Sequence, residues 1–185
     1  MNMNQHDVND MRQEEKAVCE YAAVALRAFR KSGVGAGNNI LIYGIGVIGL
    51  LIAQWAKAAG VKSIVLTDEA EDKVALAQKM SFTMAVRKEK LSEVMEADAC
   101  IECTGKSGAL AGGVNHTKAG GTVVCVGAPV EDMDFSHETY LGIQQKELKL
   151  VGVSTDNARE MNEWEEAVKA VRKGRLNVGA LRQMM

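Results

Sequence analysis

Residues 39–60 read NILIYGIGVIGLLIAQWAKAAG, and this stretch decides the fold. The apolar run at residues 40–43 predicts a buried strand, and residues 47–59 repeat apolar side chains with the 3.6-residue period of a helix. Between the two lies the pattern Gly44-x-Gly46-x-x-Gly49. Glycines at this spacing, after a strand and at the start of a helix, are typical of a turn that binds a dinucleotide.

Each glycine of this turn has a separate physical task. Gly44 permits the tight turn, Gly46 leaves room for a pyrophosphate against the backbone, and Gly49 lets the helix approach the strand. The first helical residues, Val47 and Ile48, then offer backbone N–H groups and a partial positive charge to the phosphates. We therefore expect these five residues to hold a cofactor.

The second predicted strand ends at Asp68, nineteen residues after Gly49. An acid at this place accepts hydrogen bonds from the adenosine ribose hydroxyls and repels a 2′-phosphate. The sequence therefore predicts NAD, unless Lys62 or Lys73 turns toward the site and favours NADP. The alternative is structural: Asp68 and Glu69 are acids that stabilise the first turn of a helix.

Six short apolar runs alternate with helical patterns, at residues 40–43, 63–67, 83–86, 99–103, 122–126 and 148–153. This alternation predicts an α/β fold with a doubly wound, six-stranded parallel sheet, the Rossmann fold. Ligands of such sheets bind outside the carboxyl ends of the strands. Direct contacts and ordinary turns are equally compatible with the six residues at and after the ends of strands four and five: Cys103, Thr104, Gly105, Val126, Gly127 and Ala128.

Helices are predicted at residues 72–80, 91–96 and 107–119, besides the one at 47–59. An extra N-terminal helix that stops near Gly33 places one apolar face inward, made of Val18, Tyr21, Ala22, Ala25 and Phe29. Asn157 and Glu160 form a capping-box pattern before a last helix that presents Trp164 to the core. Trp55 is also expected in the core.

Composition excludes several classes of protein. The 22 basic and 24 acidic residues are interspersed, so we expect no nucleic-acid partner. No apolar run reaches membrane-spanning length, and the N-terminus lacks the pattern of a signal peptide, so we expect no membrane contact and a cytoplasmic protein. Residues 1–10 are expected to be disordered and residues 11–185 to form one dinucleotide-binding domain.

Four cysteines lie inside apolar runs, which favours reduced core thiols over disulfides. Cys100 and Cys103 make a C-x-x-C, but it lies within ACIECTG, which is typical of a buried strand and not of a zinc or redox site. No metal-ligating or catalytic residue is nominated.

The chain resembles the zinc-dependent medium-chain dehydrogenases, in their sorbitol and polyol branch. Several segments carry the resemblance in the family's order: residues 14–29 (EEKAVCEYAAVALRAF), 43–60 (YGIGVIGLLIAQWAKAAG), 118–127 (KAGGTVVCVG), 146–153 (KELKLVGV) and 165–178 (EEAVKAVRKGRLNV). Departures are Val47 and Tyr21, where the family has proline, and Ser81, where it usually has glycine. The resemblance covers the cofactor-binding domain only.

The resemblance implies roles for particular residues. It gives Asp68 the role of the ribose acid and places Lys73 beside that ribose. Glu20 falls on a glutamate that the polyol branch can contribute to the catalytic zinc, although a solvated or interdomain carboxylate is favoured here. The family's other zinc ligands belong to a domain that this sequence does not contain, so the chain alone is expected to be catalytically incomplete.

Several readings of function remain open at this point. The leading one is the NAD-binding domain of an alcohol or polyol dehydrogenase. Three explanations stay open for the zinc-bearing catalytic domain: it belongs to a separate chain, the sequence is a fragment of a longer gene product, or the chain has become a cofactor-binding module. The alternatives are a non-enzymatic NAD sensor or regulatory subunit and a methyltransferase that uses S-adenosylmethionine, although no seventh strand is evident. The family pairs its sixth strand across a two-fold axis, which implies a homodimer through residues 148–153.

Overall fold

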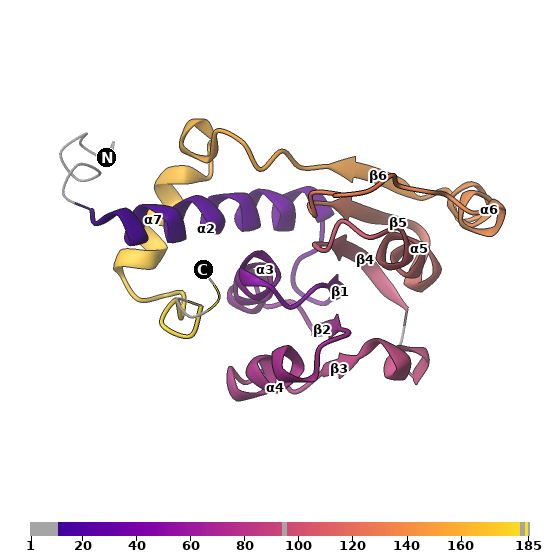
Figure 1. Cartoon of the computed structure of the whole chain (residues 1–185), viewed down its shortest axis with the longest axis horizontal. Coiled ribbons are helices and arrows are strands. Elements are labelled where there is room, and N and C mark those ends of the chain that lie inside the picture. Colours follow the sequence, from indigo (N-terminus) through magenta and orange to yellow (C-terminus); the bar gives the residue numbers. More distant parts are fainter. Residues whose placement is uncertain (1–10, 94–95, 182–183, 185) are drawn as a thin grey trace.

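The computed structural model describes residues 11–93, 96–181 and 184. Its sheet is parallel throughout and has the strand order β3-β2-β1-β4-β5-β6, which confirms the doubly wound prediction (Figure 1). The strands are β1 (Asn39–Tyr43), β2 (Ser63–Asp68), β3 (Ala85–Arg87), β4 (Ala97–Glu102), β5 (Thr117–Cys125) and β6 (Lys149–Gly152). The order reverses between β1 and β4, the place where such sheets open a crevice.

Helices cover both faces of the sheet (Figure 1). One face carries α2 (Gln13–Ser32), α3 (Val47–Ala58), α4 (Glu71–Lys79) and α7 (Trp164–Arg172). The other carries α5 (Ser107–His116), with α6 (His137–Gln145) packed beside it. The connections include two 3₁₀ helices, η1 (Lys88–Glu93) and η2 (Ala158–Glu160).

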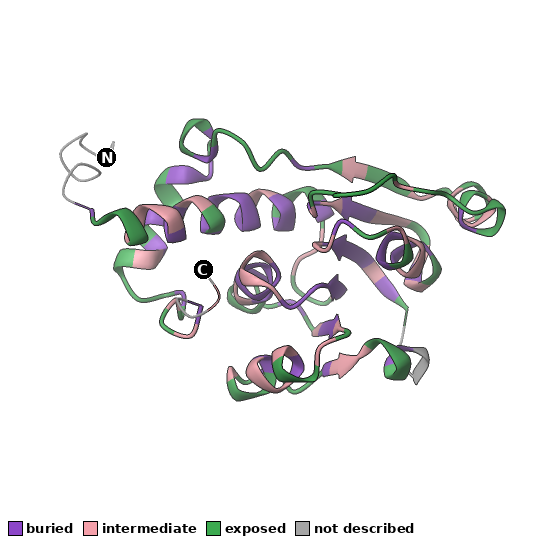
Figure 2. Cartoon of the chain, viewed as in Figure 1, coloured by how far each residue is buried: buried purple, intermediate pink, exposed green. Residues whose placement is uncertain are grey.

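The core follows the two-residue period of the strands. In β1, Ile40 and Ile42 belong to the apolar cluster under α2 and α3, whereas Leu41 and Tyr43 belong to the cluster under α5. All four side chains are buried, and Figure 2 shows the central strands in the colour of buried residues. Burial on both faces explains why β1 is apolar at successive positions.

The predicted N-terminal helix is α2, which packs along α3 and α7. It ends at Gly33, whose φ of 71° is left-handed and suits a glycine. Trp55 of α3 donates its indole N–H to the Ala22 carbonyl at 3.1 Å, so its predicted core position is confirmed. The inward position predicted for Tyr21 is wrong, because its side chain lies on the surface, 39% exposed.

Three predicted helix boundaries are wrong. Asn157 has a left-handed backbone and makes no capping bond, because the chain first forms η2 and starts α7 only at Trp164. Residues 117–119 are strand and not helix, since Thr117 pairs with Ala97 of β4. The helix predicted at 91–96 is the 3₁₀ helix η1, and residues 94–95 lie outside the described part.

Helix α6 and the turn before β3 also bear on the sequence predictions. α6 was missed by the periodicity, although Ser136 caps it by accepting the Thr139 N–H at 3.1 Å. Ser81 adopts a left-handed φ of 68° in the turn toward β3. Residues 1–10, expected to be disordered, lie outside the described residues. No helix in the described part of the chain is long and apolar enough to cross a membrane.

Candidate functional site

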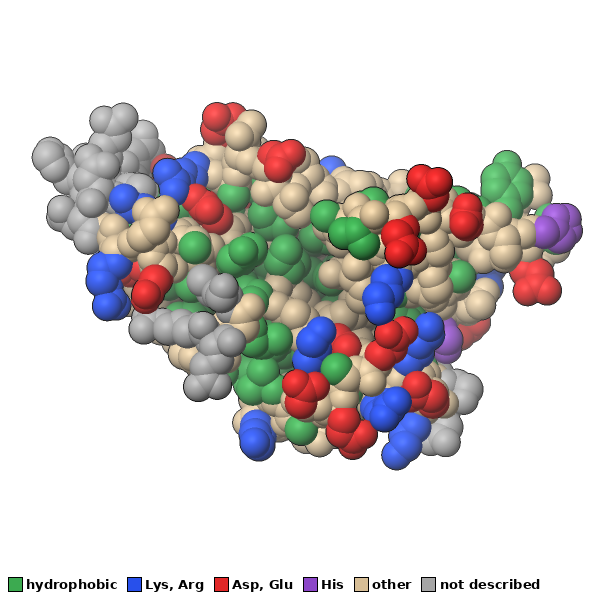
Figure 3. Space-filling model, viewed as in Figure 1, with side chains coloured by type: hydrophobic (Ala, Val, Ile, Leu, Met, Phe, Trp, Pro, Cys, Tyr) green, Lys and Arg blue, Asp and Glu red, His purple; other side chains and the backbone are tan. Residues whose placement is uncertain are grey.

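A cleft of about 270 Å³ opens at the carboxyl ends of β1, β2 and β4, where the strand order reverses. On the face seen in Figure 3, charged side chains of both signs gather in the lower part, near β3 and α4. Apolar side chains gather on the same face near α2 and α3. The cleft is lined by Tyr43, Gly44, Gly46, Thr67, Asp68, Glu69, Lys73, Lys88, Cys103, Thr104, Lys106 and Ala109.

The glycine turn between β1 and α3 is a tight fit at two positions. Gly44 has a φ of 97°, and a Cβ atom there would lie 2.8 Å from Cγ2 of Thr104. A Cβ atom on Gly49 would fall on the carbonyl oxygen of Gly44. At Gly46 an added Cβ would meet nothing within 4 Å. The first and third glycines therefore serve packing, and the second leaves open space at the cleft.

The N-terminus of α3 faces this open space. It has no acidic residue in its first turn, and its N-cap, Gly46, offers no side chain to the first amides. A second hollow of about 250 Å³ shares Gly46 and Cys103 with the cleft and is lined further by Val47, Ile48 and Gly49. Unpaired first-turn N–H groups attract anions, so the two hollows, which share lining residues, suit a long ligand with phosphates near its middle.

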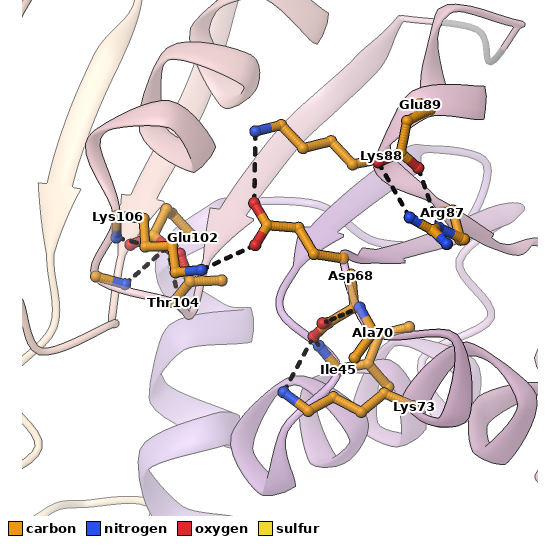
Figure 4. A network of polar contacts seen from close by, with 12 residues as sticks. Ile45, Asp68, Ala70, Lys73, Arg87, Lys88, Glu89, Glu102, Thr104 and Lys106 are labelled. Carbon is orange, nitrogen blue, oxygen red and sulfur yellow. Dashed lines mark hydrogen bonds and ion pairs between the residues drawn. The ribbon is translucent and has the colours of Figure 1, made fainter.

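Asp68 is the last residue of β2, and its carboxylate is fixed by the backbone around it. Oδ2 accepts the Ile45 N–H of the glycine turn at 2.8 Å, and Oδ1 accepts the Ala70 N–H at 3.0 Å (Figure 4). Lys73 of α4 lies 3.5 Å from Oδ2. The acid predicted for the ribose thus also ties the end of β2 to the glycine turn.

Sequence reasoning missed the two lysines on the far side of the cleft. Lys106, after β4, lies 2.9 Å from Oε2 of Glu69, and Lys88, after β3, lies 3.7 Å from Oε1. The hydrogen bond and charge of Lys106 hold the pKa of Glu69 below its usual range. Both lysines follow predicted strands, so their place at the same sheet edge was a signal that could have found them.

Glu102 is a third residue that the sequence analysis missed. It ends β4 and is 1% exposed, a rare location for a carboxylate. Its Oε1 accepts hydrogen bonds from the Thr104 backbone, the Thr104 hydroxyl and the Gly105 N–H, the last at 2.9 Å. A buried glutamate inside an apolar strand was the available signal, and its task is to hold the loop that forms one wall of the cleft.

Only two of the six cofactor-binding residues predicted at the ends of strands four and five lie in the cleft. Cys103 and Thr104 line the cleft, but the other four do not. Gly105 lies against the Ala128 carbonyl and Gly127 against the Thr104 backbone, closely enough that a Cβ on either glycine would clash. The two loops therefore pack on each other beside the cleft, with Val126 buried beneath them.

The C-x-x-C thiols are free, and burial raises the pKa of both Cys100 and Cys103. Protonated, buried thiols are poor nucleophiles and poor metal ligands.

The described residues do not fit a zinc ion. Among residues 11–93, 96–181 and 184, no group of three or more His, Cys, Asp or Glu side chains could hold a metal. Glu20, the one nominee from the resemblance, is paired with Arg159 through two nitrogens, Nε at 2.7 Å and Nη2 at 2.6 Å. Its carboxylate is engaged by a cation of the same chain.

The chain is similar in sequence and in fold to several known dehydrogenases. Mouse sorbitol dehydrogenase is 30% identical over 179 residues, which cover 91% of this chain and 48% of that protein. Galactitol-1-phosphate dehydrogenase of Escherichia coli superposes with a TM-score of 0.78 at 26% identity, over 91% of this chain and 52% of that one. A protein from Sinorhizobium meliloti described as a zinc-binding dehydrogenase, solved bound to NADP, gives 0.75 at 27% identity, over 89% and 50%.

The chain spans about half the length of the curated relatives it matches. The family model described as "Zinc-binding dehydrogenase" matches residues 47–173, which run from the first residue of α3 through α7. Because this match extends over more than half of the chain, the chain belongs to the zinc-binding dehydrogenase family.

Proposed function

We propose that residues 11–185 form the NAD-binding domain of an alcohol or polyol dehydrogenase. The observation that carries the proposal is Asp68, held by the glycine turn and facing the cleft at the reversal of strand order. An acid in this place favours a ribose 2′-hydroxyl over a 2′-phosphate. When bound, NAD exchanges a hydride with the alcohol or carbonyl substrate.

Residues along the cleft suit the pyrophosphate, the adenosine ribose and the other end of such a cofactor. The open space at Gly46 and the first amides of α3, from Val47 to Gly49, suit the pyrophosphate. Among the described residues, Thr67 carries a buried hydroxyl with no hydrogen-bond partner, and Thr67 lines the cleft. We assign the adenosine ribose to Asp68, Glu69 and Lys73, and the other end of the cofactor to Cys103 and Thr104, the residues after β4 that line the cleft.

In this proposal the ligands of the catalytic zinc do not come from the described residues. Because Glu20 is paired with Arg159 and no metal cluster occurs in the described part, we propose that a separate zinc-bearing segment or chain completes the enzyme. The same observations favour one alternative, a non-enzymatic NAD sensor. Oxidation of a polyol after addition of the zinc-bearing partner would exclude the sensor.

We further propose a homodimer formed through β6, in the cytoplasm, where the four free cysteines stay reduced. β6 is an edge strand, and Leu150 on it is 39% exposed. Exposed apolar edges are commonly covered by a partner. Light scattering at micromolar concentration should give twice the chain mass, and Leu150→Lys should give the monomer mass. A monomeric unsubstituted chain contradicts the dimer.

Calorimetric titration tests the cofactor. We expect NADH to bind, NADPH to bind more weakly, and S-adenosylmethionine not to bind. Asp68→Ala should weaken the binding of NADH by about tenfold or more, which corresponds to one or two lost hydrogen bonds to a charged group. Asp72→Ala is the matched control, since Asp72 is exposed on α4 and does not line the cleft. Absence of NADH binding, or tight S-adenosylmethionine binding, would refute the proposal.

A further inference from the structure

The end of β2 carries a second carboxylate whose partners come from two other strands. Glu69 follows Asp68 directly and is 55% exposed at the cleft. Lys106 approaches it from the end of β4 and Lys88 from the end of β3, so two cations pair with one carboxylate, one at each oxygen. All three side chains line the cleft.

The two lysines meet at the start of helix α5. The ammonium of Lys88 lies at the start of α5, where a Cβ added to Gly108 would be 3.5 Å away. Lys106 is the N-cap residue of the same helix, which has no acid in its first turn and no side-chain cap. Two ammonium groups and a helix N-terminus together attract an anion, and Glu69 supplies it from within the chain.

The neighbouring residue gives this arrangement a consequence for cofactor choice. Asp68 is the residue to which we assign the ribose, so a 2′-phosphate would lie beside it, within reach of the cations around the cleft. Lys73 is already paired with Asp68, and the other two are paired with Glu69. The hydrogen bond and charge of Glu69 also raise the pKa of Lys106.

We propose that Glu69 is a specificity-determining residue, which occupies Lys88 and Lys106 and thereby withholds them from the 2′-phosphate of NADP. This inference rests on the proposed NAD-binding function of the cleft. Asp68 would repel the phosphate directly, and Glu69 would remove the cations that could attract it.

The test compares Glu69→Gln with Glu71→Gln in calorimetric titrations with NADH and NADPH. Glu71 is the matched control, because it lies two residues away, is 80% exposed and pairs with Arg87 outside the cleft. Freeing two partly exposed ammonium groups should raise the ratio of NADPH to NADH affinity about tenfold in Glu69→Gln. Glu71→Gln should leave that ratio within about twofold. The gain should shrink at about 0.5 M salt, because exposed charges are screened there.

Two further substitutions, combined with Glu69→Gln in one variant, show whether the lysines carry the gain. Adding Lys88→Met and Lys106→Met to Glu69→Gln should abolish the improved NADPH binding. Persistence of the gain in that triple variant, or equal NADPH affinity in Glu69→Gln and Glu71→Gln, overturns the inference while NAD binding itself stands. If the unsubstituted chain binds no NADH, the proposed function fails and the inference falls with it.

Discussion

Replacing Glu102 by alanine removes the acceptor that organises the loop after β4. The Glu102 carboxylate accepts three hydrogen bonds, from the Thr104 N–H, the Thr104 hydroxyl and the Gly105 N–H. In Glu102→Ala these donors lose their partner, and the Gly105 N–H is buried at that contact. A neutral hydrogen bond contributes about 1 kcal/mol, one to a charged group about 1.5–3 kcal/mol, and an unpaired buried donor costs a further 1–3 kcal/mol.

We expect the free energy of unfolding to fall by about 3–4 kcal/mol in Glu102→Ala, because water can reach the partly buried Thr104 and recover part of the loss. Glu102→Gln keeps one acceptor oxygen and should cost about 1 kcal/mol, as should Thr104→Val, which removes one donor. A domain of ordinary stability, about 5–15 kcal/mol, remains folded after each change.

Guanidinium unfolding followed by tryptophan fluorescence measures these losses, since Trp55 and Trp164 are both buried in the native chain. Glu138→Ala serves as the control, because Glu138 is an exposed acid in the first turn of α6. A loss below about 1 kcal/mol in Glu102→Ala, or equal losses in the alanine and glutamine variants, would refute the role given to this carboxylate.

Three further changes probe the turns and the strand ends. Gly49→Ala forces a Cβ onto the Gly44 carbonyl and should lower the free energy of unfolding by roughly 2 kcal/mol, with loss of NADH binding; an unchanged affinity would contradict the tight turn. Ser81→Gly removes the steric cost of a left-handed backbone at φ 68° and should raise the free energy of unfolding by about 0.5–1 kcal/mol in the same assay. An unchanged free energy of unfolding would show that serine has no cost in this turn. The Lys118 hydrogen bond, helped by the Asn39 N–H, lowers the pKa of Asp98, so its stabilisation is present above the unfolded pKa near 3.9 and is lost as pH falls through the lower, folded pKa. Asp98→Asn should therefore be less stable than the native chain at pH 7, and the difference should shrink as the pH is lowered toward about 2. A difference that does not change with pH would exclude the effect.

The sequence determined the fold because its strongest signals are local. A strand, a glycine turn and a helix are adjacent in residues 39–60, and Asp68 ends the next strand, so their meeting at one sheet edge follows from parallel pairing alone. The N-terminal helix was likewise predictable from its apolar period, since α2 buries Val18, Ala22 and Ala25. Only Tyr21 departs from that face.

Errors arose where distant pairing overrides a local pattern. Thr117 is strand because β4 offers it a partner, although the preceding residues favour helix. Asn157 and Glu160 have the spacing of a capping box, but the left-handed backbone of Asn157 leads into a 3₁₀ turn. Glu20 was expected to be a solvated or interdomain carboxylate, and only the fold shows its partner, Arg159, 139 residues away in the chain.

What the sequence by itself determined is the sheet, its glycine turn and the acid beside it, because each depends on neighbours within a few residues. Only the tertiary structure decided which charges meet above the cleft. Lys88 and Lys106 come from different strand ends, and their convergence on Glu69 depends on the order β3-β2-β1-β4. The bonding of buried Glu102 depends in the same way on how the loop after β4 folds back. Long-range ion pairs and buried carboxylates have no period in a sequence, since their partners are set by strand order and packing.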